Sequence, residues 1–197
     1  MSFKIFNIYE TENIEVKDIG LKKVINLRPR IILKSHGRIK FDPSKSKVNV
    51  VERLINLLQV PGSRGKKHRI ITSWQSGKFA KSAKIVLDAF KIIEEKTKKN
   101  PVEVLVRAIE NAAPREEVTS IEYGGARYPK AVDISPRRRL NLALRFIVNG
   151  AYDKAFGKKV SIVEALSKEI VAAAENTGES YAVQKKTDLE KQADAAR

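Results

Sequence analysis

The chain reads NPVEVLVRAIEN at residues 100–111, a strong start for a helix. Asn100 is a favoured N-cap residue, Pro101 suits the first helical position, and Glu103 can close a capping box. Apolar residues then recur at helical spacing, and the helix must end before Pro114. The stretch therefore predicts an amphipathic helix with one buried face.

Similar start and stop signals predict further helices on both sides of this one. They cover about residues 48–60, about residues 78–98, the stretch from Ser135-Pro136 through Ala151, residues 161 to about 178, and a short charged segment capped by Thr187. The chain is therefore expected to be mainly α-helical.

One segment within this helical body has a different period. The residues on both sides of Gly124-Gly125 have the two-residue period of β-strands. This pattern predicts a β-hairpin at about residues 118–134. Near the turn lie three residues that suit contact with a nucleic-acid groove or strand, Arg127, Tyr128 and Lys130. A lysine also protects ordinary sheet edges, so that purely structural role stays open.

The first 47 residues lack the helical pattern. Residues 1–20 are weakly acidic, and the alternation at residues 3–9 allows one short strand. Residues 21–47 are basic and interrupted by prolines, and we expect them to be extended or irregular. We therefore divide the chain into an N-terminal extension with a basic arm, residues 1–47, and a helical domain, residues 48–197.

Positive charge is concentrated in one part of the chain. The net charge is +16, and residues 22–81 hold 16 Lys and Arg with only two acids, Asp42 and Glu52. No carboxylate occurs from Arg53 to Leu87. Because crowded like charges repel, this pattern indicates a polyanion partner, and a nucleic-acid backbone is the usual one. A basic face kept for solubility is the alternative, although surfaces usually intersperse both signs.

Two basic clusters suit phosphate groups. The loop at residues 62–69 carries Arg64, Lys66, Lys67 and Arg69, and the alternative for it is a solvated turn. Three consecutive arginines, Arg137, Arg138 and Arg139, follow Pro136. Arg138 and Arg145 are two helical turns apart and so share a face, and the planar guanidinium suits phosphate oxygens. Salt bridges between helices are the alternative use of these arginines.

The composition excludes several kinds of site. The chain has no cysteine, and His36 and His68, its only histidines, lack metal-ligand spacing. The loop at residues 62–67 has too few residues between its glycines for a Walker phosphate loop. No apolar run is long enough to span a membrane. We therefore expect no metal, no cofactor and no enzymatic activity.

The segments, taken in order, resemble a known family. Residues 100–111 are similar to the third-helix signature of the universal small-subunit ribosomal protein seven family. The matches continue in order with APREE at 113–117, GGA at 124–126, AVDISPRRR at 131–139 and SYAVQKKTDLE at 180–190. The resemblance covers about residues 48–197. The sequence of residues 131–135 resembles that of the archaeal and eukaryotic branch of the family.

This resemblance implies a bundle of about six helices with one protruding hairpin. It also implies a structural protein of the small ribosomal subunit, in the cytoplasm, that binds the 3′ domain of the rRNA directly and early. Such binding would nucleate assembly of the subunit head. The hairpin would lie near the exit-site path of tRNA and mRNA, with head and platform proteins as neighbours.

Carried onto this chain, the resemblance assigns rRNA binding to the clusters that charge and geometry already single out. These residues are Lys34, Arg38, Lys45, Lys47, Arg64, Lys66, Lys67, Arg69, Lys78, Lys81, Arg137, Arg138, Lys185 and Lys186. The tRNA and mRNA side comprises Gly124, Gly125, Arg127, Tyr128 and Lys130.

Charge and geometry alone leave two other functions open. An architectural protein that uses the hairpin as a minor-groove arm would bind duplex DNA as well as structured RNA. A nucleic-acid-processing enzyme would lose its activity when one or two acids were replaced.

Overall fold

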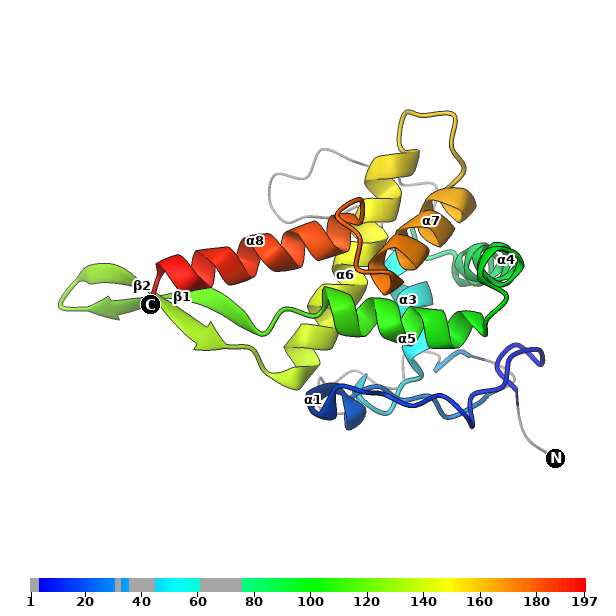
Figure 1. Ribbon diagram of the computed structural model, residues 1–197, viewed down its shortest axis with the longest axis horizontal. Helices are drawn as coiled ribbons and strands as arrows, with labels where there is room; N and C mark the ends of the chain where they lie inside the picture. The colour runs from blue at the N-terminus through cyan, green and yellow to red at the C-terminus, as the bar shows by residue number, and fades with distance from the viewer. Residues whose placement is uncertain (1–3, 31–32, 36–44, 61–75) are drawn as a thin grey trace.

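The computed structural model describes residues 4–30, 33–35, 45–60 and 76–197 (Figure 1). This part of the chain forms seven helices and one two-stranded antiparallel sheet. In chain order the elements are α1 (Ile19–Lys22), α3 (Val50–Leu58), α4 (Phe79–Thr97), α5 (Pro101–Ala112), β1 (Glu116–Tyr123), β2 (Ala126–Asp133), α6 (Pro136–Ala155), α7 (Ile162–Ala174) and α8 (Tyr181–Ala195). The prediction of a mainly helical fold with one hairpin is confirmed.

Helix α5 begins where its sequence predicts. The Asn100 side chain accepts a hydrogen bond from the N–H of Val102 at 3.0 Å, and Pro101 occupies the first turn. The amide of Asn100 also donates to the carbonyl of Glu10 at 2.7 Å, which ties the N-terminal extension to the start of the helix. The buried face of α5 packs against α4, α6, α7 and α8.

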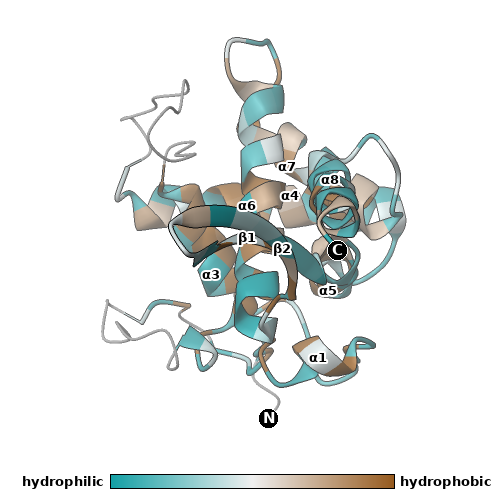
Figure 2. Ribbon diagram, turned by 90° about the vertical axis from the view of Figure 1, so that its left-hand side faces the viewer, coloured by the Kyte–Doolittle hydropathy of each residue, from teal (hydrophilic) through white to brown (hydrophobic). Residues whose placement is uncertain are grey.

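The core lies where these helices meet. Helix α7 packs against α4, α5, α6 and α8, and its Leu166 and Ile170 are fully buried. Apolar residues lie on the sides of the helices that face one another, whereas the hairpin is largely hydrophilic (Figure 2). Among the described helices, none combines the length and the apolar character needed to cross a membrane.

Helix α6 is the longest of the described helices. Its 20 residues span about 30 Å at 1.5 Å per residue. Its first turn packs beside α1, and the hydroxyl of Tyr152, near its other end, donates to the carbonyl of Leu58 at 2.7 Å. Helix α6 therefore contacts the N-terminal extension at one end and the end of α3 at the other.

The hairpin projects beyond the helices (Figure 1). Its register runs from Glu116 opposite Asp133 to Tyr123 opposite Ala126. Gly124 and Gly125 have φ values of +58° and +79°, a backbone conformation that a tight hairpin turn requires and glycine adopts without strain. Helix α8 lies along the base of the strands, so only the outer part of the hairpin stands free.

The predicted start of the last helix is wrong. Helix α8 begins at Tyr181 with Ser180 as its N-cap, not at Thr187. The hydroxyl of Thr187 instead donates to the carbonyl of Val183 at 3.0 Å, within the helix. A threonine followed by an acid can therefore imitate a cap when its hydroxyl is satisfied by the preceding turn.

Helix α7 ends earlier than predicted, at Ala174 rather than near residue 178. The side-chain amide of Asn111, on α5, donates to the carbonyls of Ala173 and Ala174 at 3.0 and 2.9 Å. Asn176 then adopts a left-handed conformation with a φ of +55°. The last carbonyls of the helix are thus shared between Asn111 and the residues that follow the helix, because the N–H of Asn176 donates to Ala173 and the N–H of Thr177 donates to Ala172.

The N-terminal extension also departs from its prediction. Residues 4–9 form no strand, because Phe6 and Asn7 have φ values of +53° and +60° and turn the chain so that Ile5 pairs with Tyr9. The short helix α1 was not predicted. Ile5 and Leu21 are fully buried in the same core as the helices, so the described part of the extension packs onto the bundle.

Candidate nucleic-acid interface

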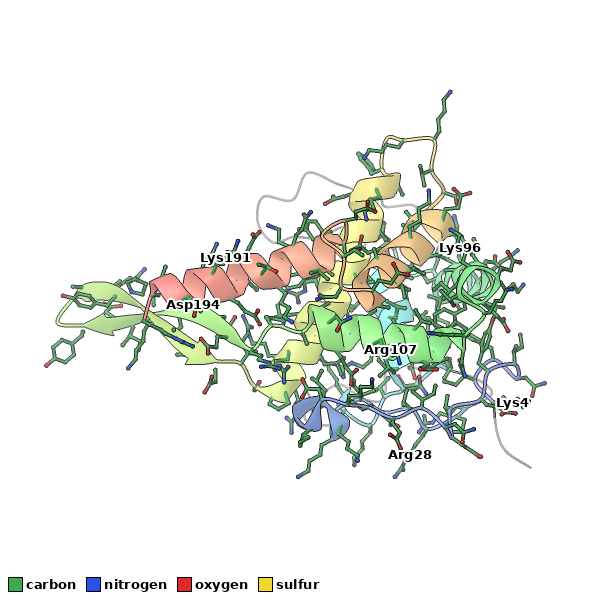
Figure 3. The ribbon with its side chains drawn as sticks, in the orientation of Figure 1. Lys4, Arg28, Lys96, Arg107, Lys191 and Asp194 are labelled. Carbon is green, nitrogen blue, oxygen red and sulfur yellow. The ribbon has the colours of Figure 1, made fainter. Side chains whose placement is uncertain are left out.

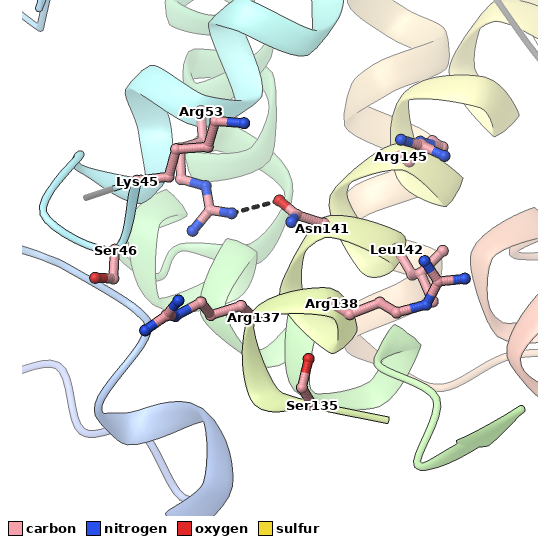
Figure 4. Close-up of a pocket in the computed structure, with 9 residues that line it drawn as sticks. All are labelled: Lys45, Ser46, Arg53, Ser135, Arg137, Arg138, Asn141, Leu142 and Arg145. Atoms are coloured by element: carbon pink, nitrogen blue, oxygen red, sulfur yellow. Dashed lines mark hydrogen bonds between the residues drawn. The ribbon is translucent and has the colours of Figure 1, made fainter. Parts of the chain in front are cut away.

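Two adjoining hollows between α3 and α6 bring basic side chains together; we name them the basic hollow. One, of about 320 Å³, also reaches the segment at Lys45 and the start of α6 (Figure 4). The other, of about 390 Å³, extends along α3 to Asn56 and Leu57. Their combined lining is Lys45, Ser46, Arg53, Asn56, Leu57, Ser135, Arg137, Arg138, Asn141, Leu142 and Arg145. None of these described lining residues is a carboxylic acid.

The three consecutive arginines at the start of α6 have three different environments. Arg139 is buried, donates to Asp18 at 2.7 Å and to the carbonyl of Pro114 at 3.1 Å, and so holds the extension. Arg138 forms a two-pronged ion pair with Glu117 on β1, with contacts of 2.6 and 2.7 Å. Arg137 is exposed, lines the basic hollow and has no partner within the described residues.

The bond to Glu117 raises the pKa of Arg138, and burial opposes the rise only in part. Arg138 therefore stays charged, but a carboxylate already occupies its guanidinium. Of the two α6 arginines predicted to bind rRNA, Arg137 keeps its whole charge for a ligand, and Arg138 shares it with the hairpin.

The structure adds two residues that the sequence did not select, Arg53 and Asn141, and places them beside Arg145, which its spacing from Arg138 had singled out. Arg53, on α3, is only 8% exposed, and its guanidinium donates to the side-chain oxygen of Asn141 on α6. Arg145 follows Asn141 by about one helical turn and is exposed. The spacing of Arg138 and Arg145 was a signal for the α6 face. Nothing local could have shown that Arg53 meets it, because α3 and α6 are far apart in the sequence.

The other predicted rRNA-binding residues lie in several places. Lys34 places its Nζ 5.4 Å from the centre of the Phe79 ring. Lys78 and Lys81 are exposed at the start of α4, and Lys47 is exposed next to α3. The predicted Arg38, Arg64, Lys66, Lys67 and Arg69 lie outside the described residues.

Two predicted lysines on α8 have contacts within the protein. Lys185 pairs with Asp188 at 3.0 Å. Lys186 donates to the carbonyl of Asn111 at 3.0 Å and so joins α8 to the end of α5. Neither lysine lines the basic hollow.

The hairpin tip carries exposed aromatic side chains. Tyr128 is 58% exposed and lies opposite Ile121, and Tyr123 is 82% exposed on the same face. Arg127, on the other face, pairs with Glu122 at 3.6 Å. Tyr123 and Ile121 were not predicted as site residues, although their alternation with Glu122 in the sequence placed them on one face of a strand.

A further hollow, of about 230 Å³, lies between α4, α5 and α7 and has both signs of charge. Its lining includes Lys96 and Arg107, whose side chains are labelled in Figure 3, together with Lys99, Glu103 and Glu175. Arg107 pairs with Glu103 at 3.6 Å. The basic hollow differs from this mixed-charge hollow because no acid among its described lining residues offsets its cations. Within the described residues, no group of three or more His, Asp or Glu side chains is placed to hold a metal ion.

Comparisons with known proteins agree with the resemblance. Residues 27–197 match the model of the family described as "Ribosomal protein S7p/S5e". The small ribosomal subunit protein uS7 of Nanoarchaeum equitans is 48% identical to this chain, and the alignment covers the whole of both. The uS7 proteins of Picrophilus torridus and Methanothermobacter thermautotrophicus are each 46% identical, over 98% of both chains. The chain therefore belongs to the ribosomal protein S7p/S5e family, and it is a protein of the small ribosomal subunit.

Proposed function

We propose that this chain binds small-subunit rRNA directly, within the 3′ domain, and nucleates assembly of the subunit head in the cytoplasm. The observation that carries the proposal is the basic hollow, where cations from α3, the Lys45 segment and α6 converge without a carboxylate in the described lining. Membership of a small-subunit family makes rRNA the polyanion to expect. Its role there is structural.

The proposed rRNA-binding surface comprises the basic hollow and the other basic residues that the sequence selected. It includes Lys34, Arg38, Lys45, Lys47, Arg53, Arg64, Lys66, Lys67, Arg69, Lys78, Lys81, Arg137, Arg138, Arg145, Lys185 and Lys186. Exposed lysines and arginines bind phosphates by charge, so each should contribute to the salt dependence of binding.

A salt-titrated binding competition tests the proposal. The competitors are the 3′-domain fragment of small-subunit rRNA, an unrelated structured RNA and duplex DNA. We expect the rRNA fragment to bind about a thousandfold more tightly than the others, the range usual for specific complexes. Equal binding of all three would overturn the proposal, and a preference for duplex DNA would favour an architectural DNA-binding protein.

We further propose that the hairpin tip lies near the exit-site path of tRNA and mRNA. The exposed Tyr123 and Tyr128, together with Lys130, support this, because aromatic rings stack on unpaired bases and a lysine attracts phosphates. A neighbouring head or platform protein would pack near the C-terminal region of the chain.

Shortening the hairpin by removing residues 121–128 and joining the strands with two glycines tests this role. The base of the hairpin, which α8 contacts, would remain. We expect unchanged affinity for the rRNA fragment and altered exit-site tRNA occupancy in reconstituted subunits. A large loss of rRNA affinity would contradict this division of labour.

A further inference from the structure

We propose that the basic hollow holds two consecutive phosphates of an RNA strand and contacts no base edges, so that it adds affinity but no sequence preference. This inference rests on the proposed rRNA binding and assigns one part of it to one site. It follows from the hydrogen-bonding groups in the hollow, their charges and its shape.

The two amides in the hollow present donors. The side-chain oxygen of Asn141 accepts from Arg53, which leaves the NH₂ group of Asn141 as its remaining polar group. The side-chain oxygen of Asn56 accepts from Gln59 at 3.0 Å, which leaves the NH₂ group of Asn56 in the same way. The orientation of both amides is thus set by neighbours on the protein.

With the amides set, the hollow is rich in donors and poor in acceptors. Lysine and arginine side chains only donate hydrogen bonds, and apart from the two amide oxygens already engaged by Arg53 and Gln59, the acceptors among the described lining side chains are the hydroxyls of Ser46 and Ser135. Phosphate oxygens only accept, whereas base edges present both donors and acceptors. The lining therefore matches a phosphate far better than it matches a base.

The charges agree with this assignment. The start of α6 carries the positive end of the helix dipole, and its first turn contains no acid. Asp18 and Glu117 offset Arg139 and Arg138, but Arg137 and Arg145 have no counter-ion within the described residues. An anion in the hollow would relieve this repulsion and satisfy both arginines.

The shape of the site suggests more than one phosphate. Its two parts share Lys45, Arg53, Asn141 and Arg145 in their linings. Figure 4 shows Arg137 and Arg145 at different sides of the Arg53–Asn141 pair. A strand that crosses the pair would place one phosphate near Arg137 and the next near Arg145.

Two variants test the inference. Arg145→Gln removes one exposed cation, and Asn141→Asp adds an acceptor and a negative charge. Affinity for the 3′-domain fragment and for an unrelated structured RNA is measured at several salt concentrations, and circular dichroism checks the fold. Lys96→Gln, in the mixed-charge hollow between α4, α5 and α7, is the control for losing one positive charge.

We expect Arg145→Gln to weaken binding of both RNAs by the same factor, about tenfold, and to make the salt slope about one unit shallower. Asn141→Asp should weaken both RNAs further and equally, and Lys96→Gln should change neither by more than about twofold. The preference for the rRNA fragment should stay at the wild-type value in every variant.

Three results would overturn the inference. One is a selective loss of the rRNA fragment, which would mean that the hollow recognises bases. The second is tighter binding by Asn141→Asp, which would indicate a base amino group as the ligand. The third is unchanged binding in both variants, or an equal loss in Lys96→Gln. Failure of the proposed function is distinguishable, because it would appear in the wild-type protein as an absent preference for rRNA.

Discussion

Gly150 allows three helices to meet at close range. A Cβ atom at this position of α6 would lie 2.8 Å from the Cβ of Tyr181 and 2.9 Å from the Cδ of Glu169. Real side chains do not approach so closely, and neither neighbour can easily move, because Tyr181 begins α8 and Glu169 is fully buried on α7. The packing of α6 against α7 and α8 thus depends on a missing side chain.

Gly150→Ala should therefore destabilise the protein by about 1–3 kcal/mol, the usual cost of an overpacked core site. Denaturant unfolding followed by circular dichroism measures the change. Gly178→Ala is the matched control, because a Cβ there meets nothing within 4 Å and should leave stability nearly unchanged. Equal stability of the two variants would show that the helices move apart without cost.

Glu169 is the buried carboxylate that holds the same junction. Its oxygens accept from Lys154 Nζ at 2.6 Å, from the Ser180 hydroxyl at 2.8 Å and from the N–H of Ala182 at 3.0 Å. The carboxylate therefore binds α6 and fixes the first turn of α8. This contact reinforces the N-cap of α8, where the Ser180 hydroxyl accepts from the N–H of Val183.

Glu169→Gln should leave Lys154 without its buried counter-charge. Breaking a buried ion pair usually costs about 3–5 kcal/mol, and we expect about 2 kcal/mol here because the Lys154 side chain keeps access to solvent. Thermal and denaturant unfolding measure the loss, with Glu175→Gln on the exposed end of α7 as the control. A loss no larger than that of the control would show that the pair is not needed.

At the scale of elements, the N-terminal extension contacts the helical bundle at two places, near Tyr9 and near Asp18. Tyr9 meets Phe90 edge to face with ring centres 5.8 Å apart, and the N–H groups of Lys17 and Asp18 donate to Glu110. Asp18 also accepts from Arg139 and caps α1. The extension is therefore an integral packing element of the described structure, not an appendage of the helices.

The contact between Asp18 and Arg139 makes this docking depend on pH. Burial would raise the pKa of Asp18, but the hydrogen bond and charge of Arg139 and the N–H groups of Gly20 and Leu21 hold it below its ordinary value of 3.8. The docked carboxyl binds protons less readily than the free one, so the contact stabilises docking above about pH 4 and is lost as the pH falls through the lowered pKa.

Methyl NMR of Leu21 between pH 6 and pH 2 measures this loss, with Leu144 as a reporter of the bundle core. We expect the Leu21 signal to change at a higher pH than the Leu144 signal. Asp18→Asn should weaken docking already at pH 6 and remove this step, whereas the exposed Asp194→Asn should not. Simultaneous change of both signals in every variant would show that the extension does not undock separately.

At the scale of the whole molecule, the excess of positive charge lowers the stability of the free protein. The net charge is +16, and the basic hollow gathers several cations without an acid among its described lining residues. Such self-repulsion destabilises the compact state of the free protein and favours a polyanion. If the basic hollow binds rRNA as proposed, the free protein should be stabilised when cations of the hollow are removed.

The double variant Arg137→Gln with Arg145→Gln should raise the melting temperature of the free protein at low salt. The expected gain is up to about 1 kcal/mol for two exposed substitutions, and it should shrink in high salt as the repulsion is screened. Lys96→Gln with Lys99→Gln is the control, because Glu103 and Glu175 line the same hollow. A lower melting temperature in the first variant would mean that the two arginines stabilise the fold.

Local signals in the sequence predicted most of the elements. The cap and proline before α5, the two glycines of the hairpin and the apolar stripes of α4 and α6 each act within one or two turns, so they can be recognised without tertiary structure. At the start of α8 and the end of α7, two places where prediction failed, Glu169 and Asn111 on other helices add hydrogen bonds to the local ones that Ser180 and Thr177 make.

The sequence by itself determined the family, the helical class, the hairpin and the concentration of positive charge. Only the tertiary structure decided which cations face a ligand. Arg139 and Arg138 are held by Asp18 and Glu117, 121 and 21 residues away, while Arg53 reaches Asn141 from 88 residues away. Neighbouring arginines carry the same charge in any sequence, and the fold separates their roles because it alone chooses the partner that each one meets.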